Sequence, residues 1–409
     1  MKKVLSVLIA FLCFAVLFSS CANKTGEDIT GEPSSAEEKS LPMFTDSLKI
    51  DLGKAKLYFT TDHKNSVSSV RNGFTMLGDF CADIIISSYI DEGEESIQPD
   101  NVNWGGYDIK NDELTKFLNN DLLTADFVSS DSVIMNDTDL YEFVTPKHDE
   151  NNNNKCVLIC ASYSYSECVS VLTIDYSSPT NIKMSKLNDE EFIYLANDLM
   201  KYNVKTKENV KFVTPENGVK IVNVCAYNNL VYIICDVSGK KQLRIYDSDG
   251  KLQSTAMFPD SSIICNEFKV FADCMFIGYN DTAIYKLSDG KITLFEKERD
   301  PAEIYLVHGN ANAVNTKNCP YVIFMKKYTT SNGVEKEYKL INLFNDKVYD
   351  ISFTPEEGEF TVVSNIVTDE YGNLIVEMQS TDDNGETAPD CKYYKVDATA
   401  IKLTLGNQQ

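Results

Sequence analysis

Residues 243–252, LRIYDSDGKL, decide the fold because the chain repeats them as residues 282–292, TAIYKLSDGKI. The two stretches start at an offset of 39 residues, and their Asp-Gly pairs are 40 residues apart. The apolar runs before them, residues 229–234 (NLVYII) and 273–278 (DCMFIG), align at an offset of 44. Each copy contains four short apolar runs separated by turn residues. A four-strand unit of this length is typical of one blade of a β-propeller.

The Asp-Gly pairs of the repeat predict tight turns. Asp249-Gly250 and Asp289-Gly290 each separate two alternating runs, and Asp-Gly is favoured in two-residue hairpins because both turn positions need a positive φ. The change of offset predicts that residues 236–242 form a longer connector than residues 279–281. Residues 247–250 also resemble the start of a calcium loop, but the twelfth position, which needs a carboxylate, is Phe258. A hairpin explains them without a metal.

Comparable runs continue to the C-terminus. Four units between Gly218 and Leu405 occupy 188 residues, or 47 each. Dividing residues 44–409 by this length gives between seven and eight units. Because part of the N-terminal segment is expected to complete a strand and to contain insertions, we predict an all-β domain, a β-propeller of seven four-stranded blades, with six and eight still open. Residues 48–52 and 56–60 are short alternating runs near the N-terminus, and we expect a strand there to complete the last blade and close the propeller.

Residues 189–202 fit two interpretations. Apolar residues at positions 192, 195, 196, 199 and 200, with acidic residues before them, form a helical stripe. Residues 202–212, however, fit the strand pattern around Tyr246 and Tyr285. The repeat context favours strands, and a helix stays open.

The N-terminus has the layout of a secretory signal. Lys2 and Lys3 precede an apolar run from Val4 to Phe18, which is shorter than the roughly 20 residues of a membrane span. Residues 18–21, FSSC, resemble the lipobox of bacterial lipoproteins, although that family usually has Leu where this chain has Phe18. The resemblance implies that residues 1–20 are a signal peptide and that Cys21 is the lipid attachment site. The protein would then be anchored in the cell membrane and face outward; ordinary secretion and an uncleaved anchor are the alternatives.

Residues 21–43 have the composition of a flexible tether. After Cys21 they are rich in Gly, Ser, Glu, Thr and Pro and show no apolar periodicity. A tether of this length has a mean reach of about 25 Å. We therefore expect residues 44–409 to form a propeller domain that stands clear of the bilayer.

Charge excludes nucleic acid as a partner. The chain has 38 basic and 61 acidic residues, a net charge of −23. No Lys/Arg cluster compensates locally, so the surface repels phosphate backbones and anionic lipids.

The cysteines predict neither a metal nor a cofactor. Ten of the twelve remain after Cys13 in the leader and Cys21. Several lie within apolar runs, which favours buried thiols for most of them, with one or two disulfides as the alternative. There is no Cys-x-x-Cys pair, and the three histidines stand apart from any cysteine cluster, at His63, His148 and His308.

Catalytic signatures of known propeller enzymes are missing from the sequence, and we assign no catalytic residue. The chain has three arginines, one tryptophan and no Gly-x-Ser-x-Gly motif, which disfavours sialidase-like, quinone-dependent and peptidase chemistry. A pair of carboxylates for glycoside hydrolysis stays open, as does a polysaccharide lyase. Trp104, between Asn103 and Gly105, is interpreted as a core or blade-edge aromatic, with a sugar-stacking platform as the alternative.

The blade turns of the Tyr-Asp-x-Asp-Gly-Lys kind resemble those of propeller-repeat lipoproteins. That resemblance implies binding or scaffolding. We therefore predict a lipid-anchored, non-catalytic module for a protein, peptide or glycan, with its ligand held near the central axis. The alternatives are a carbohydrate-active enzyme on the same scaffold and an envelope sensor or assembly component.

Overall fold

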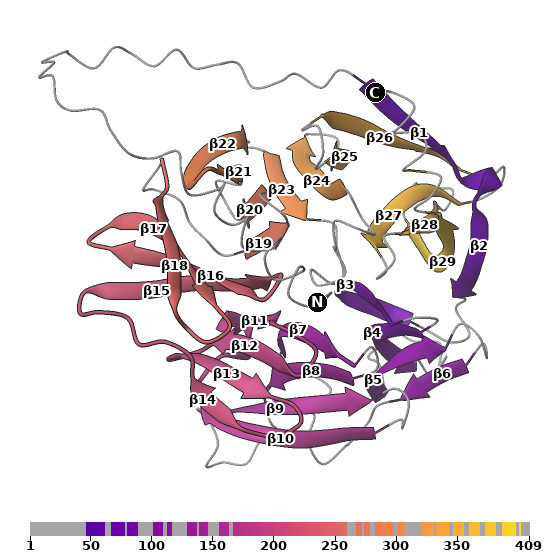
Figure 1. Cartoon of the computed structure of the whole chain (residues 1–409). Coiled ribbons are helices and arrows are strands. Elements are labelled where there is room, and N and C mark those ends of the chain that lie inside the picture. Colours follow the sequence, from indigo (N-terminus) through magenta and orange to yellow (C-terminus); the bar gives the residue numbers. More distant parts are fainter. Residues whose placement is uncertain are drawn as a thin grey trace, which may run out of the picture. The chain divides into compact units, whose positions relative to one another are not determined.

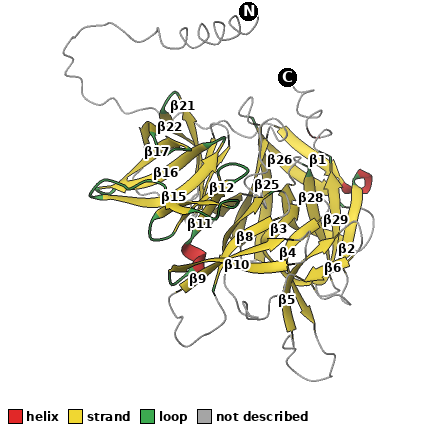
Figure 2. Cartoon of the chain, turned by 60° about the horizontal axis from the view of Figure 1, so that its bottom comes forward, coloured by secondary structure: helices red, strands yellow, loops and turns green. Residues whose placement is uncertain are grey.

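The structure is a computed structural model, and its described residues are almost entirely β-strand (Figure 2). The chain divides into two compact units, Met1–Ser40 and Leu41–Gln409, and every described residue belongs to the second. Within the described part, no helix is long and apolar enough to cross a membrane. The described residues are 46–61, 67–77, 80–88, 101–108, 113–116, 129–136, 139–145, 155–162, 167–259, 267–271, 274–278, 283–297, 302–306, 321–330, 333–342, 347–355, 360–368, 373–381, 387–397 and 401.

The described strands pair into seven sheets (Figure 1). Two short 3-10 helices, η1 (Leu52–Lys54) and η3 (Pro179–Asn181), lie between strands. Five sheets consist of four strands consecutive in the chain: β3 (Val67–Leu77), β4 (Phe80–Ser88), β5 (Asn101–Asp108) and β6 (Glu113–Lys116); β7 (Ser129–Met135), β8 (Asp139–Val144), β9 (Lys155–Ser162) and β10 (Glu167–Asp175); β11 (Lys183–Lys186), β12 (Glu191–Leu195), β13 (Leu199–Asn203) and β14 (Asn209–Lys211); β15 (Val219–Tyr227), β16 (Leu230–Val237), β17 (Lys240–Asp247) and β18 (Leu252–Met257); β19 (Glu267–Phe271), β20 (Cys274–Gly278), β21 (Ala283–Ser288) and β22 (Lys291–Lys297).

The last two sheets are completed by strands from the N-terminus (Figure 1). One contains β23 (Ala302–Leu306), β24 (Tyr321–Thr330), β25 (Gly333–Asn342) and β26 (Val348–Thr354), with β1 (Asp46–Asp51) added parallel to β26. The other contains β27 (Phe360–Thr368), β28 (Leu374–Thr381) and β29 (Thr387–Val396), with β2 (Lys56–Thr61) antiparallel to β29. The expected closure of the last blade by an N-terminal strand is therefore confirmed.

Strands that follow one another in the chain pair antiparallel within all seven sheets. In the five sheets of four consecutive strands, the first strand is one edge and the last strand is the other; in the two sheets completed by β1 and β2, these two strands cover β26 and β29. This is the strand order of propeller blades, and the prediction of an all-β propeller with four-stranded blades is confirmed.

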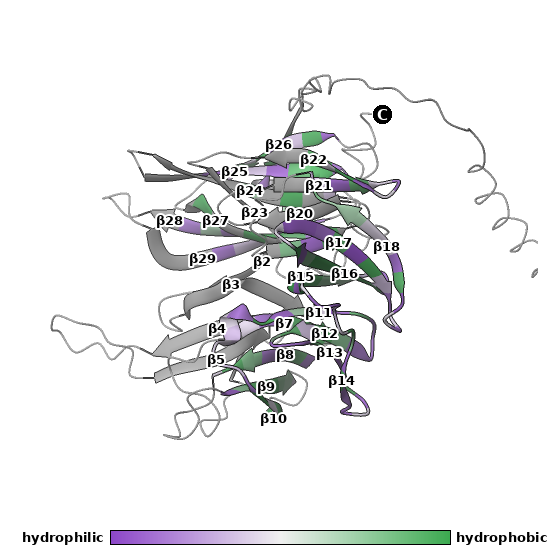
Figure 3. Cartoon of the chain, turned by 90° about the vertical axis from the view of Figure 1, so that its left-hand side faces the viewer, coloured by the Kyte–Doolittle hydropathy of each residue, from purple (hydrophilic) through white to green (hydrophobic). Residues whose placement is uncertain are grey.

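Neighbouring sheets pack face to face through alternate residues of the same strands. In β16, Val231 and Ile233 face the sheet of β11–β14, whereas Tyr232 and Ile234 face the sheet of β19–β22. This division follows from the period of two, which sends successive side chains to opposite faces. Figure 3 shows the accompanying change between hydrophobic and hydrophilic segments along β17 and β18.

The same alternation explains residues 189–202, which form β12 and β13 instead of a helix. Phe192 and Tyr194 pack against the sheet of β7–β10, and Ile193 packs against the sheet of β15–β18. Because both faces of β12 are buried, its apolar run is continuous and gives a false helical stripe. The favoured strand interpretation is confirmed.

The repeat turns differ from each other. Asp289 and Gly290, with φ of 50° and 72°, form the predicted two-residue turn between β21 and β22. At Asp249-Gly250 the prediction is wrong, since only Gly250 has a positive φ, of 81°. Its N–H donates to Asp247 O at 3.0 Å, and Asp247 N–H donates to Lys251 O at 3.0 Å, which makes a longer loop.

The expected long connector at residues 236–242 is also wrong. β16 and β17 continue through this region to a two-residue turn at Ser238 and Gly239, whose φ values are 54° and 82°. The first copy of the repeat is longer because these two strands are longer. A matching turn at Asn228 and Asn229 joins β15 to β16.

Five cysteines carry thiols and no disulfide, which confirms the prediction for this group: Cys156, Cys160, Cys168, Cys225 and Cys235. Burial raises the pKa of Cys156 and of Cys235 to about 11 each, so both are protonated at neutral pH. The side chains of the other five lie outside the described residues. So do residues 1–20, the tether at 21–43 with Cys21, and the three histidines.

A substitution of Leu52 tests the packing where β1 and β2 complete the last two sheets. Leu52 lies in η1 between β1 and β2, is 0% exposed and belongs to the core shared by the last two sheets. Leu52→Ala should lower the free energy of unfolding by about 2–5 kcal/mol because it leaves a cavity. Denaturant unfolding of the full-length protein measures this loss. Leu252→Ala is the matched control, since Leu252 is 47% exposed; an equal loss in both variants would contradict the packing.

Candidate functional site

The first strands of neighbouring sheets contact one another directly, as in the pairs β7–β11, β11–β15 and β15–β19. In a propeller the sheets surround a central channel, so these contacting edges are the ones that face it. Polar residues occur on all four strands. We call the following set the inner belt: Ser130 and Asp131 on β7, Lys183 and Ser185 on β11, Cys225 on β15, and Lys269 on β19.

A β-bulge displaces Asp131 from the regular ladder of β7. Ser129 pairs with Val144 and Ser132 pairs with Glu142, so the residues between them have one partner, Phe143. The N–H of Phe143 donates to Ser130 Oγ at 2.9 Å instead of to a backbone carbonyl. Bulges of this kind re-aim a side chain.

Asp131 forms an ion pair with the next sheet. Its Oδ2 lies 3.9 Å from Lys183 Nζ on β11, and the two side chains are 37% and 25% exposed. Both charged groups can therefore be reached by solvent.

Ser185, two residues after Lys183, joins β11 to β15. Its Oγ accepts from Ala226 N–H at 2.8 Å and lies 3.4 Å from Ala226 O, to which it can donate. Ser185 is buried, as is Ser130, whose Oγ lies 3.3 Å from Met184 Sδ. Both hydroxyls hold neighbouring strands together.

Cys225 lies on β15, which contacts both β11 and β19. Burial raises the pKa of the Cys225 thiol, and the charge of Asp131 raises it too. The charge of Lys269 and hydrogen bonds from Val270 N–H and Ser185 act in the opposite direction, but the pKa remains above its ordinary value. The thiol is therefore neutral at pH 7 and is a poor nucleophile.

The inner belt consequently combines neutral buried groups, called the floor residues, with partly exposed charged side chains. The floor residues Ser130, Ser185 and Cys225 are buried among backbone groups, whereas Asp131 and Lys183 are partly exposed. Such an arrangement can bind polar or charged groups through ion pairs and hydrogen bonds. Within the belt, no nucleophile is paired with an activating base.

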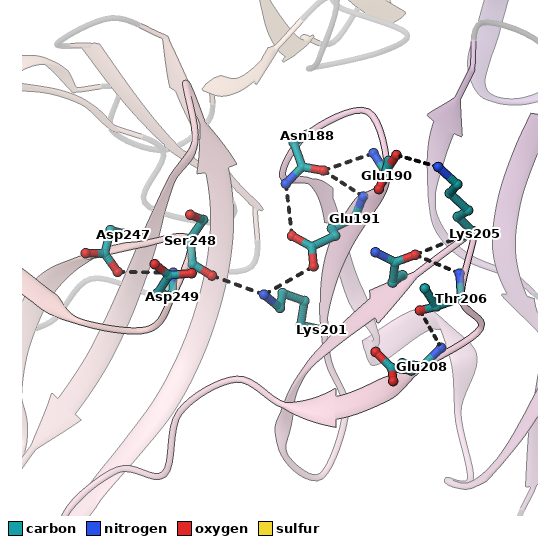
Figure 4. A network of polar contacts seen from close by, with 11 residues as sticks. Asn188, Glu190, Glu191, Lys201, Lys205, Thr206, Glu208, Asp247, Ser248 and Asp249 are labelled. Atoms are coloured by element: carbon teal, nitrogen blue, oxygen red, sulfur yellow. Dashed lines mark hydrogen bonds and ion pairs between the residues drawn. The ribbon is translucent and has the colours of Figure 1, made fainter.

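A second polar cluster joins the sheet of β11–β14 to the sheet of β15–β18 (Figure 4). Lys201 Nζ lies 3.2 Å from Glu191 Oε1 and donates to the carbonyl oxygen of Ser248 at 3.2 Å. Glu191 Oε2 accepts from Asn188 Nδ2 at 3.0 Å. Ser248 belongs to the turn between β17 and β18, so Lys201 bridges two sheets.

The carboxylate of Asp247 also has a structural role. Its Oδ1 accepts from the N–H groups of Asp249, at 3.1 Å, and of Lys251, at 2.9 Å. These bonds organise the turn that resembles the start of a calcium loop. Among the residues with described side chains, no group of three or more His, Cys, Asp or Glu could hold a metal ion.

The pKa of Glu191 is lowered by its contacts with Asn188 and with Lys201, which bridges the two sheets. Burial raises the pKa of this carboxyl, but hydrogen bonds from Asn188 and Lys201 and the charge of Lys201 outweigh burial and hold the pKa below its usual range. A lowered folded-state pKa contributes stability that is present above the unfolded pKa and is lost as the pH falls through the folded pKa.

Lys201→Met should lower the free energy of unfolding at pH 7 by about 1–3 kcal/mol, because Glu191 and the Ser248 carbonyl both lose their donor. The difference from the wild type should shrink as the pH falls through the pKa of Glu191. Denaturant unfolding at pH 7 and at pH 3 measures both effects. Lys205→Met is the control, because its ion pair with Glu190 is exposed and should contribute less than about 1 kcal/mol; equal losses would rule out the bridge.

The sequence assigned Cys21 and singled out Trp104, and neither belongs to the inner belt. Cys21 lies outside the described residues. Trp104 is on β5, opposite Ile85, and its side chain is not among those described. The belt was missed by sequence reasoning. The sequence does contain polar residues inside the first strands of sheets, such as Asp131 within β7. These residues can be recognised as a group only after the first strand of each sheet is known.

Comparisons with known proteins show remote likenesses. No family model and no curated protein matches the chain. A chain of the mitotic checkpoint complex is 7% identical with a TM-score of 0.45, covering 92% of this chain and 99% of that one. BamB from Moraxella catarrhalis is 11% identical with a TM-score of 0.43, covering 82% and 97%. The β-propeller domain of the Trilobed protease from Pyrococcus furiosus is 11% identical with a TM-score of 0.40, covering 62% and 77%. The fold assignment rests on the strand pairing.

Proposed function

We propose that the protein is a lipid-anchored, outward-facing β-propeller that binds a protein, peptide or glycan partner and performs no chemistry. The observation that supports this proposal is the inner belt, where the charged side chains of Asp131 and Lys183 are partly exposed and the neutral floor residues are buried. We infer further that each of the seven sheets is one blade, with β1 as an extra strand on its sheet.

Binding is favoured over catalysis by the state of the belt's reactive groups. Cys225 is held neutral by burial. Ser185 uses its hydroxyl to join β11 to β15, so a displacement of that hydroxyl would disturb the contact between the two sheets. A charged pair on a rigid support can recognise a partner without either residue reacting.

The belt gives the proposed function a direct test. Lys183→Glu in the full-length protein should weaken binding of the physiological partner, captured from cell-envelope extracts, by at least about tenfold, or about 1.4 kcal/mol. Lys211→Glu is the matched control: Lys211 is half exposed on β14, the last strand of the same sheet. Equal capture by both variants would contradict binding at the belt, and turnover in a glycan hydrolysis screen would contradict a non-catalytic role.

Attachment to the membrane is tested at Cys21. In cells given a labelled fatty acid, the wild-type protein should carry the label and remain with membranes. Cys21→Ala should lose the label, whereas Cys13→Ala should keep it because Cys13 lies in the part of the leader that is removed. Label retained by Cys21→Ala would overturn the proposed anchor.

A further inference from the structure

The four first strands that contact one another carry more positive than negative charge. β7, β11, β15 and β19 together contain four lysines, Lys183, Lys186, Lys220 and Lys269, and two acidic residues, Asp131 and Glu267, for a net charge of +2 (4 − 2). The whole chain has a net charge of −23. Positive charge is therefore retained on these strands while the rest of the chain is strongly acidic.

Lys183 is the lysine of these strands that pairs with the inner-belt carboxylate. Lys183 lies beside Asp131 on the neighbouring strand, and the charge of Lys269 acts on Cys225, which also feels Asp131. Ser185 follows Lys183 on β11 by two residues and contacts the backbone of β15 next to Cys225. Lys183 and Asp131 thus lie on the same two strands as the buried hydroxyl groups of Ser185 and Ser130.

The ion pair between Asp131 and Lys183 is long. Its 3.9 Å separation exceeds the roughly 2.7–2.9 Å of a charge-assisted hydrogen bond. Both side chains are partly exposed, so an incoming anion can approach the ammonium group of Lys183. The carboxylate of Asp131 is the anionic group that lies beside Lys183 in the structure.

We propose that the inner belt binds an anionic group of its partner, a carboxylate or a phosphate, through Lys183, and that Asp131 competes with this group for Lys183. The inference rests on the proposed function of the belt as a binding site. The inference specifies the chemistry of the ligand, and it identifies Asp131 as a residue that weakens ligand binding. Phosphate and carboxylate share the chemistry of an oxyanion beside ammonium donors.

Opposite effects of two substitutions test the competition. Inorganic phosphate and citrate are titrated separately into the full-length protein by calorimetry, at constant ionic strength set with sodium chloride. Asp131→Asn should tighten binding of the preferred anion by about tenfold, and Lys183→Met should weaken it by about tenfold. Lys211→Met on β14 should leave it unchanged. The anion that responds identifies the group on the partner.

Thermal unfolding of each variant without anion shows whether it is folded, and Lys183→Arg should retain binding if Lys183→Met does not fold. Equal affinities in wild type, Asp131→Asn and Lys183→Met would overturn the proposal, as would binding of neither anion by any folded variant. If capture of the partner still depends on Lys183 while no anion binds, the belt is a binding site and the anionic ligand class is wrong. If capture does not depend on Lys183 either, the proposed function also fails.

Discussion

Face-to-face packing of consecutive sheets is the constraint on which the rest of the structure depends. A middle strand such as β12 sends Phe192 to one neighbouring sheet and Ile193 to the other, and both side chains are fully buried. Fully burying an apolar side chain of this size contributes about 1.5–3 kcal/mol relative to leaving it exposed. The sheets of β11–β14 and β15–β18 are therefore each stabilised from both sides, and either sheet would expose half of its core if one neighbour were missing.

The same packing determines where polar residues can lie. Middle strands are covered on both faces and paired at both edges, whereas the first strand of each sheet keeps one edge without a strand partner. The inner belt lies on these edges. Its buried hydroxyls are used by the backbone, as when Ser130 accepts from Phe143 N–H and Ser185 accepts from Ala226 N–H. The charged groups of Asp131 and Lys183 lie where solvent reaches them. In the proposed function, rigidity and recognition come from different residues on the same strands.

Local sequence rules predicted the features that depend on local chemistry. Asp289-Gly290 forms its turn because both residues accept a positive φ, and the N-terminal runs become the strands that complete the last two sheets. The identical dipeptide at Asp249-Gly250 forms a longer loop because Asp247 captures the N–H groups of Asp249 and Lys251. The bridge through Lys201 and the inner belt join residues from different sheets, and no sequence pattern indicates which strands of an irregular repeat will meet.

Hydrogen exchange of the full-length protein with and without its captured partner tests most directly whether the first strands form the binding surface. Slower exchange of backbone amides in β7, β11, β15 and β19, with little change in the last strands β10, β14, β18 and β22, is the result expected from binding at the inner belt. Protection confined to the last strands would place the partner on the opposite edge of the sheets and contradict it.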